Sequence, residues 1–242
     1  MKLLLSSGGN GSLSKEQMKE LHGQIYKLFG NIKEVVFISY AVKDQRKYTS
    51  GIRNFLWPLK DVNLIGIEEF GDPIQAIRDA KGIYIGGGNT FLLTDKLHKN
   101  NLIDILKDVI KQGVPYMGVS AGTNVACPTM MTTNDMPVII PNSFETLELI
   151  DFQINAHYHE GKMWLGNEGD FVKHNGETRA QRIAEFHQHN EAPVIGLFEG
   201  SCINWKDDKG ELKIGGGVIF KAGKDPKVVK RGAIINSNLD IL

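Results

Sequence analysis

Short apolar runs alternate with amphipathic segments along the first half of the chain. The apolar runs have the length and composition of buried strands, and they cover residues 2–6, 34–39, 62–67 and 82–85. Helical periodicity is clearest in residues 14–29, where apolar side chains recur every third or fourth position and Ser14 and Gln17 fit a capping box. This pattern predicts a strand followed by a helix, repeated along the chain.

Four further helices are expected between and after these runs. Proline marks two of them, since Pro58 interrupts one helix and Pro73 suits the first turn of another. The four segments are 44–59, 72–80, 90–98 and 102–112. Strands that alternate with helices in this way favour a parallel sheet, because parallel neighbours need long crossover connections.

After residue 122 the pattern is less regular. We expect a short helix broken near Pro128 and a polar loop within 125–136, strands at 138–140, 152–155 and 194–197, a helix at 177–189, and antiparallel hairpins within 202–220. Residues 161–175 are rich in glycine and charge, which indicates either a lid over a site or a surface insertion.

These elements together predict an α/β fold: a doubly wound, mostly parallel sheet with helices on both faces and antiparallel hairpins at its C-terminal end. A chain of 242 residues that is 41% hydrophobic can bury a full core. Folds of this kind and size commonly form one domain, so we expect a single domain over residues 1–242.

Charge and cysteine content narrow the possible partners. Lysine plus arginine equals aspartate plus glutamate at 28 each, so no global basic surface favours nucleic acid or an anionic membrane. The two cysteines are too few for a disulfide framework, and the apolar run at the N-terminus is too short for a signal peptide or a membrane span. We expect a cytoplasmic protein, monomeric or homodimeric, with a small-molecule substrate.

Residues 114–122 form an apolar strand that runs into Gly118-Val119-Ser120-Ala121-Gly122. This is the G-x-S-x-G form of a nucleophile elbow, in which a tight strand-to-helix turn exposes the serine oxygen at the top of a sheet. A helix that begins near Ala121 would direct unpaired N–H groups and the positive end of its dipole toward an oxyanion beside Ser120. Ser120 is therefore the candidate nucleophile.

A serine nucleophile needs a base, and the chain has seven histidines. Helix positions explain four of them without a catalytic role: His22, His98, His187 and His189. His157 and His159 follow an apolar run, so a strand end would deliver one of them to the site. Strand alternation places both on one face, but no third ligand stands out, and we expect neither a metal nor a cofactor.

Two acids are candidates to orient the base. Asp135 follows the serine and precedes His157, which is the chain order of α/β-hydrolases. Glu199 lies at the carboxyl end of an expected strand, where a side chain faces the ligand crevice. The spacing of these residues along the chain does not show which of the two acids orients the base.

The glycine-rich loop 86–90, Gly-Gly-Gly-Asn-Thr, also follows a strand. Its spacing fails the G-x-G-x-x-G pattern and no G-K-[ST] follows, so a nucleotide site is disfavoured. The N–H groups of Gly88 and Ala121 would instead form the two sides of an oxyanion hole. We also assign Asn89 of this loop to substrate binding.

Several motifs together carry a resemblance to a known family. They are Gly-x-Ser-Ala-Gly-x-Asn-x-Ala-Cys-Pro-Thr at 118–129, Thr-Thr-Asn-Asp-Met-Pro at 132–137, Gln-Ile-Asn-x-His at 153–157 and Gly-Glu-Thr-Arg-x-Gln-Arg-Ile at 176–183. With these motifs the chain resembles the peptidase E family, α-aspartyl dipeptidases that share the class I glutamine amidotransferase-like fold. It differs from bacterial members in a longer loop after His157.

The resemblance implies hydrolysis of dipeptides with an N-terminal aspartate, Asp-X. By motif, Ser120 matches the family nucleophile, His157 its base, and Asp135 and Glu199 both match acids assigned to its triad. Arg179 matches the residue that binds the aspartate side chain. That role suits a guanidinium, which grips a carboxylate with two hydrogen bonds.

Other functions remain alternatives. The same nucleophile would serve a serine exopeptidase that acts on β-aspartyl or cyanophycin-derived peptides. A glutamine amidotransferase is disfavoured, because that chemistry uses cysteine where this chain has serine. A non-catalytic binder of acidic amino acids is the alternative from a different class.

Overall fold

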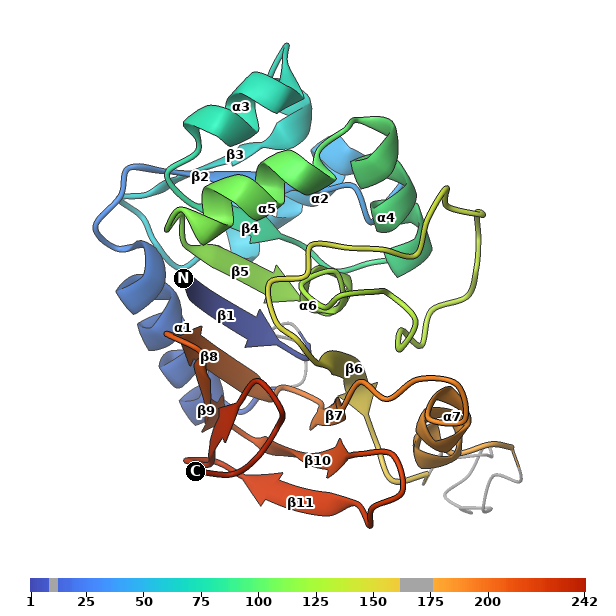
Figure 1. Cartoon of the computed structure of the whole chain (residues 1–242). Coiled ribbons are helices and arrows are strands. Elements are labelled where there is room, and N and C mark those ends of the chain that lie inside the picture. Colours follow the sequence, from blue (N-terminus) through green and yellow to red (C-terminus); the bar gives the residue numbers. More distant parts are fainter. Residues whose placement is uncertain (9–12, 162–175) are drawn as a thin grey trace, which may run out of the picture.

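The structure is a computed structural model of the chain, and it describes residues 1–8, 13–161 and 176–242 (Figure 1). The loop expected at 161–175 lies, apart from its first residue, outside the described residues. Among the described helices, none is long and apolar enough to cross a membrane.

An eight-stranded sheet forms the centre of the molecule. Its strand order is β12-β9-β8-β1-β5-β4-β2-β3. The strands are β1 (Lys2–Ser6), β2 (Glu34–Ile38), β3 (Asn63–Gly66), β4 (Ile83–Ile85), β5 (Tyr116–Val119), β8 (Cys202–Lys206), β9 (Lys209–Ile214) and β12 (Ile234–Asn236). The five strands from β1 to β3 pair in parallel, while β8, β9 and β12 add an antiparallel edge. The expected mostly parallel sheet with a C-terminal hairpin is therefore present.

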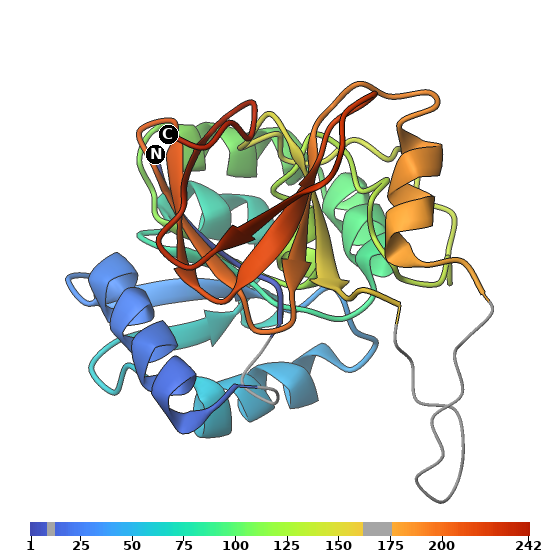
Figure 2. The ribbon, with the colours of Figure 1, turned by 90° about the horizontal axis from the view of Figure 1, so that it is seen from below.

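Helices cover both faces of this sheet, as Figure 2 shows from a second direction. Strand residues alternate between the two faces, so neighbours such as Leu4 and Leu5 belong to separate hydrophobic clusters. One face packs against α1 (Lys15–Phe29), α2 (Gln45–Gly51) and the π-helix η2 (Ile52–Leu56). The other packs against α3 (Pro73–Asp79), α4 (Thr90–Lys99) and α5 (Ile103–Lys111). The short 3₁₀ helix η3 (Ile67–Glu69) follows β3.

A second, four-stranded sheet has the order β11-β10-β7-β6. Its strands are β6 (Gln153–Tyr158), β7 (Val194–Phe198), β10 (Gly216–Phe220) and β11 (Lys227–Lys230). β6 and β7 are parallel, so their carboxyl ends lie side by side. Helix α7 (Arg179–Phe186) packs against this sheet through Ile183. Residues that follow β6 and residues that follow β7 therefore lie next to each other at the same end of the second sheet.

Two local predictions were wrong, and two strands were missed. Helix α6 (Ala121–Asn124) starts directly after Ser120 and ends before residue 125, so no helix runs into Pro128. Residues 138–140 form no strand, because this stretch lies at the surface with no neighbouring strand to complete a ladder. Strands β11 and β12, beyond residue 220, were not predicted.

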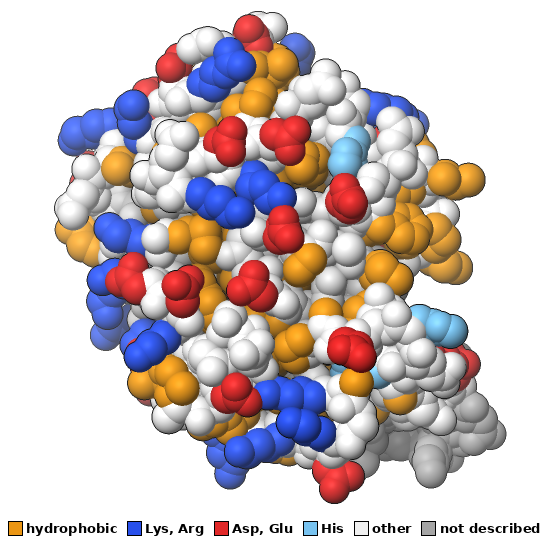
Figure 3. All heavy atoms as spheres, viewed as in Figure 1, with side chains coloured by type: hydrophobic (Ala, Val, Ile, Leu, Met, Phe, Trp, Pro, Cys, Tyr) orange, Lys and Arg blue, Asp and Glu red, His pale blue; other side chains and the backbone are white. Residues whose placement is uncertain are grey.

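The segment 131–144 crosses the surface beside α4, and its exposed hydrophobic side chains gather at the right of Figure 3. Polar contacts hold it in place: the Asn89 Nδ2 group donates to the Met136 carbonyl at 2.8 Å, and the Asn134 Nδ2 group donates to the Ala156 carbonyl at 2.7 Å. These bonds tie the segment to the start of α4 and to β6.

Candidate active site

Ser120 occupies a strained turn between β5 and α6. Its backbone has φ 54° and ψ −109°, a conformation that costs a non-glycine residue about 1–3 kcal/mol. A Cβ at Gly118 would lie 2.5 Å from the Gly122 carbonyl oxygen, and a Cβ at Gly122 would collide with the Ile85 carbonyl oxygen. Both glycines are therefore needed for the close packing of α6 on the sheet, as a nucleophile elbow requires.

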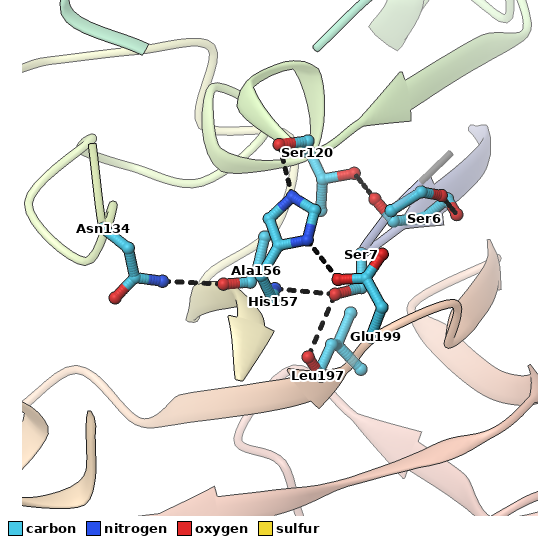
Figure 4. A network of polar contacts seen from close by, with 10 residues as sticks. Ser6, Ser7, Ser120, Asn134, Ala156, His157, Leu197 and Glu199 are labelled. Atoms are coloured by element: carbon cyan, nitrogen blue, oxygen red, sulfur yellow. Dashed lines mark hydrogen bonds and ion pairs between the residues drawn. The ribbon is translucent and has the colours of Figure 1, made fainter. Parts of the chain in front are cut away.

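Three side chains form a chain of hydrogen bonds at the elbow (Figure 4). The Ser120 hydroxyl donates to His157 Nε2 over 2.8 Å, and His157 Nδ1 donates to the Glu199 carboxylate. The His157 and Glu199 side chains are 41% and 43% exposed, so the site is open to a substrate. This order of hydroxyl, imidazole and carboxylate allows the serine to lose its proton as it attacks a carbonyl carbon.

His157 reaches Ser120 because β6 bulges next to it. The pairing of β6 with β7 shifts register between Asn155 and Tyr158, and His157 has φ 56°. Ser7 fixes this bulge: its Oγ accepts from the His157 backbone N–H at 2.8 Å and donates to the Leu197 carbonyl at 3.0 Å. The bulge also corrects the expected alternation, because His157 contacts Ser120 while His159 lines a separate cavity beside Arg179.

Ser6 holds the elbow from the same strand end. Its carbonyl oxygen accepts from the Ser120 backbone N–H at 3.0 Å and from the Thr123 hydroxyl at 2.7 Å. Neither Ser6 nor Ser7 was predicted from the sequence as part of the site. The sequence feature that could have identified them is their position at the carboxyl end of the first parallel strand, where ligand sites form.

Asp135 does not contact His157 by hydrogen bond. Its Oδ2 accepts from the Thr90 backbone N–H at 2.7 Å and from the Thr90 hydroxyl at 2.6 Å. Thr90 is the first residue of α4, so the carboxylate sits at the positive end of a helix. Of the two acids left open by the sequence, the structure pairs Glu199 with the imidazole and Asp135 with α4.

Asn89 is engaged by the protein at both ends of its side-chain amide. Its Oδ1 accepts from the Leu92 N–H at 3.0 Å as the N-cap of α4, and its Nδ2 donates to the Met136 carbonyl. These bonds hold Asn89 at the start of α4, and its contact with substrate stays a prediction.

The two expected oxyanion donors lie on either side of Ser120, Gly88 on the glycine loop and Ala121 at the start of α6. Gly88 has φ 133° and lines a cavity together with Gly87, Ser120 and His157. A Cβ at Gly87 would lie 3.1 Å from the Ser120 Cβ, so the glycine loop passes directly beside the serine. Ala121 is the first residue of α6, where a helix leaves its N–H groups without intrahelical partners.

Arg179 lies at the start of α7, in a cavity of about 140 Å³ that Asn134, His159 and Arg182 also line. Its Nε is buried and has no hydrogen-bond partner among the described residues. Burial lowers the pKa of Arg179, Arg182 lowers it further, and Asp135 opposes the shift. A half-buried guanidinium whose buried Nε lacks an acceptor is suited to bind an anionic ligand.

His159 shares this cavity. Its Nδ1 accepts from the Gly161 N–H at 3.2 Å, which leaves Nε2 as the protonated nitrogen of the neutral ring. Burial lowers the pKa of His159 and the Arg179 charge lowers it further. The neutral ring can therefore donate one hydrogen bond to a ligand without adding a charge.

The remaining histidines and possible metal ligands lie elsewhere. His98 and His187 bond to backbone carbonyls through Nε2, at 2.9 Å from Glu145 and 3.1 Å from Ala192. Within residues 1–8, 13–161 and 176–242, no three His, Cys, Asp or Glu side chains gather as a metal site.

A strained serine elbow beside an imidazole and a carboxylate is typical of serine hydrolases. Comparison with known proteins is more specific. The model of peptidase family S51 matches residues 3–213, and the chain belongs to this family. The resemblance to peptidase E that the motifs predicted is confirmed.

Two relatives match over most of their length. A Streptomyces coelicolor protein named peptidase E is 38% identical over 211 residues, 86% of this chain and 82% of its own. A Drosophila melanogaster protein named "probable alpha-aspartyl dipeptidase" is 42% identical over 216 residues, 87% of this chain and 85% of its own. The crystal structure of a peptidase from an acI-B1 actinobacterium has a TM-score of 0.63 at 17% identity, covering 97% of this chain and 96% of that one, and so shares the mixed α/β fold.

Proposed function

We propose that this protein is a serine dipeptidase that hydrolyses Asp-X dipeptides through an acyl-enzyme on Ser120. The hydrogen-bonded series from Ser120 through His157 to Glu199 is the observation that carries the proposal. Membership of peptidase family S51 and the name of the Drosophila relative support the substrate class.

The chemistry follows from the hydrogen bonds. Ser120 Oγ attacks the aspartyl carbonyl carbon while its proton passes to His157 Nε2. The N–H groups of Gly88 and Ala121 stabilise the oxyanion, where the loss of one such donor typically costs about 10²- to 10³-fold in kcat. The imidazolium then protonates the leaving amine, the C–N bond breaks, and water hydrolyses the aspartyl ester with His157 as base. Glu199 holds Nδ1–H and stabilises the charged imidazole throughout.

Arg179 is the proposed ligand of the substrate's aspartate side chain. Its unpartnered Nε and the adjacent neutral His159 provide donors for a carboxylate. An asparaginyl side chain would lose the charge-assisted bond, which contributes about 1.5–3 kcal/mol. The predicted kcat/KM for Asn-Leu is therefore about 10- to 100-fold below that for Asp-Leu.

We also infer that the fold is of the class I glutamine amidotransferase type. A central parallel sheet with the serine elbow after β5 supports a class I glutamine amidotransferase-like fold in one domain over residues 1–242.

The decisive experiment compares the wild-type protein with Ser120→Ala on Asp-Leu. The variant should lose hydrolysis while its circular dichroism spectrum and melting temperature stay close to wild type, and EDTA should leave the wild-type rate unchanged. Full activity of the variant would refute the proposal. A matched assay with β-linked Asp-Leu tests the alternative exopeptidase reading, since the proposed enzyme cleaves the α-linked peptide faster.

A further inference from the structure

A second cavity, of about 260 Å³, opens beside Ser120 and lies between the sheet and the helices α1, α2 and η2. Within the part of the chain that the structure describes, it shares no lining residue with the Arg179 cavity. Leu21 and Ile25 from α1 and Ile52 and Leu56 from η2 form one wall, strands β4 and β5 form the other, and Ser120 and His157 lie at the mouth.

The walls of this cavity are apolar. Among the described residues, no lysine, arginine, aspartate or glutamate lines it, and hydrophobic side chains from two helices face the strands β4 and β5. A dry apolar cavity of about 150 Å³ is large enough to bind benzene. The larger space here therefore fits a branched aliphatic or aromatic side chain, and its described walls carry no acidic or basic side chain that would pair with a charged residue.

The position of His157 determines which half of a dipeptide lies in the cavity. His157 Nε2 must protonate the leaving amine, and His157 and Ser120 both line this cavity. The aspartyl half is directed to the Arg179 cavity, which has the opposite chemical character. The residue that carries the leaving amine therefore extends toward α1 and η2.

We propose that this cavity binds the side chain of the second residue of Asp-X, and that it selects leucine, methionine and phenylalanine over small or charged residues. This inference rests on the proposed dipeptidase function and adds the identity of X. It assigns Leu21, Ile25, Ile52 and Leu56 as specificity residues.

Leu56 offers a way to test the wall without disturbing the core. Its side chain lines the cavity, yet the residue is 44% exposed. The adjacent Phe55 is 85% exposed and does not line the cavity. The pair provides a test position and a matched control on the same turn of η2.

The first experiment measures kcat/KM of the wild-type protein for Asp-Leu, Asp-Phe, Asp-Ala, Asp-Lys and Asp-Glu. One methylene in an apolar pocket is worth about 10- to 200-fold in specificity. We expect Asp-Leu and Asp-Phe to exceed Asp-Ala by at least about tenfold, and to exceed Asp-Lys and Asp-Glu by more. Equal values across the series would overturn the inference.

The second experiment compares Leu56→Glu, Leu56→Ala and the control Phe55→Glu. Leu56→Glu should lower the Asp-Leu to Asp-Lys ratio of kcat/KM by about tenfold or more. The new carboxylate attracts the ammonium group of a lysine side chain and disfavours an apolar one. Leu56→Ala should lower the Asp-Leu to Asp-Ala ratio. Phe55→Glu carries the same charge change outside the cavity and should keep both wild-type ratios.

The outcomes separate this inference from the function on which it rests. If the wild-type protein cleaves no Asp-X dipeptide, the proposed function fails. If it cleaves them all but the Leu56 variants keep the wild-type ratios, or Phe55→Glu changes them equally, only the assignment of the cavity fails.

Discussion

Glu199 and Asp135 differ in what they contact, and exchanging each carboxylate for its amide separates their roles. In Glu199→Gln the side chain keeps its shape but loses the charge that faces His157 Nδ1. In Asp135→Asn the lost charge faces the start of α4, where Thr90 donates two bonds of 2.7 and 2.6 Å. The first change acts on the imidazole and the second on a helix end.

Glu199→Gln should therefore lower kcat, whereas Asp135→Asn should lower the melting temperature. In a buried Ser-His-Asp triad the acid-to-amide change lowers kcat by about 10⁴. Glu199 is 43% exposed, so water partly replaces the lost charge, and we expect a decrease of about 10²- to 10⁴-fold, or roughly 2.7–5.5 kcal/mol in barrier height. The melting temperature of Glu199→Gln should change little, because exposed ion pairs contribute little to the free energy of unfolding.

Asp135→Asn should instead lower stability. Loss of a capping carboxylate costs about 0.5–2 kcal/mol, and a protein of this size loses roughly 2–4 °C in melting temperature per kcal/mol. Its kcat should stay within about tenfold of wild type. Steady-state hydrolysis of Asp-Leu and thermal unfolding of both variants measure the two effects. A hundredfold loss of kcat in Asp135→Asn, with Glu199→Gln near wild type, would refute the pairing seen in the structure.

Three further changes test other parts of the site. Ser7→Ala should lower both kcat and melting temperature, because it leaves the part-buried His157 N–H without its acceptor, at a cost of about 1–3 kcal/mol. An active, fully stable variant would contradict the role of Ser7 in fixing the bulge. Gly122→Ala should cost about 1–3 kcal/mol or more in unfolding free energy, measured by urea titration, since its Cβ meets the backbone of β4; wild-type stability would contradict this packing. Burial raises the pKa of the Cys127 and Cys202 thiols to about 12, so both stay protonated at pH 8 and should react with Ellman's reagent only after unfolding; rapid labelling of the native protein would contradict their burial.

Local patterns were sufficient to predict the parallel core and the elbow. Hydrophobic runs and capping signals such as Ser14 with Gln17 depend on neighbours in sequence, and the structure contains that capping box. The G-x-S-x-G motif likewise specifies its own turn. The apolar run before His157 and His159 predicted that one of the two would reach the elbow, and the resemblance to the peptidase E family selected His157.

The choice between Asp135 and Glu199 could not be made in this way. Both follow Ser120 in the chain, and their roles depend on the path of the segment 131–144 and on the pairing of β6 with β7. The bulge at His157 is a tertiary effect as well, since Ser7, 150 positions away, supplies the bond that holds it. Alternation along a strand cannot reveal such an interruption.

Strand β1 lies between β5 and β8, although β8 begins only at Cys202. During synthesis β1 emerges long before β8. The edge of β1 that pairs with β8 therefore has no partner strand until most of the chain has been made. The same strand end carries the two serines that fasten the elbow and the imidazole. Hydrolytic competence should consequently arise late and all at once, and a nascent chain that stops before residue 202 should cleave no peptide.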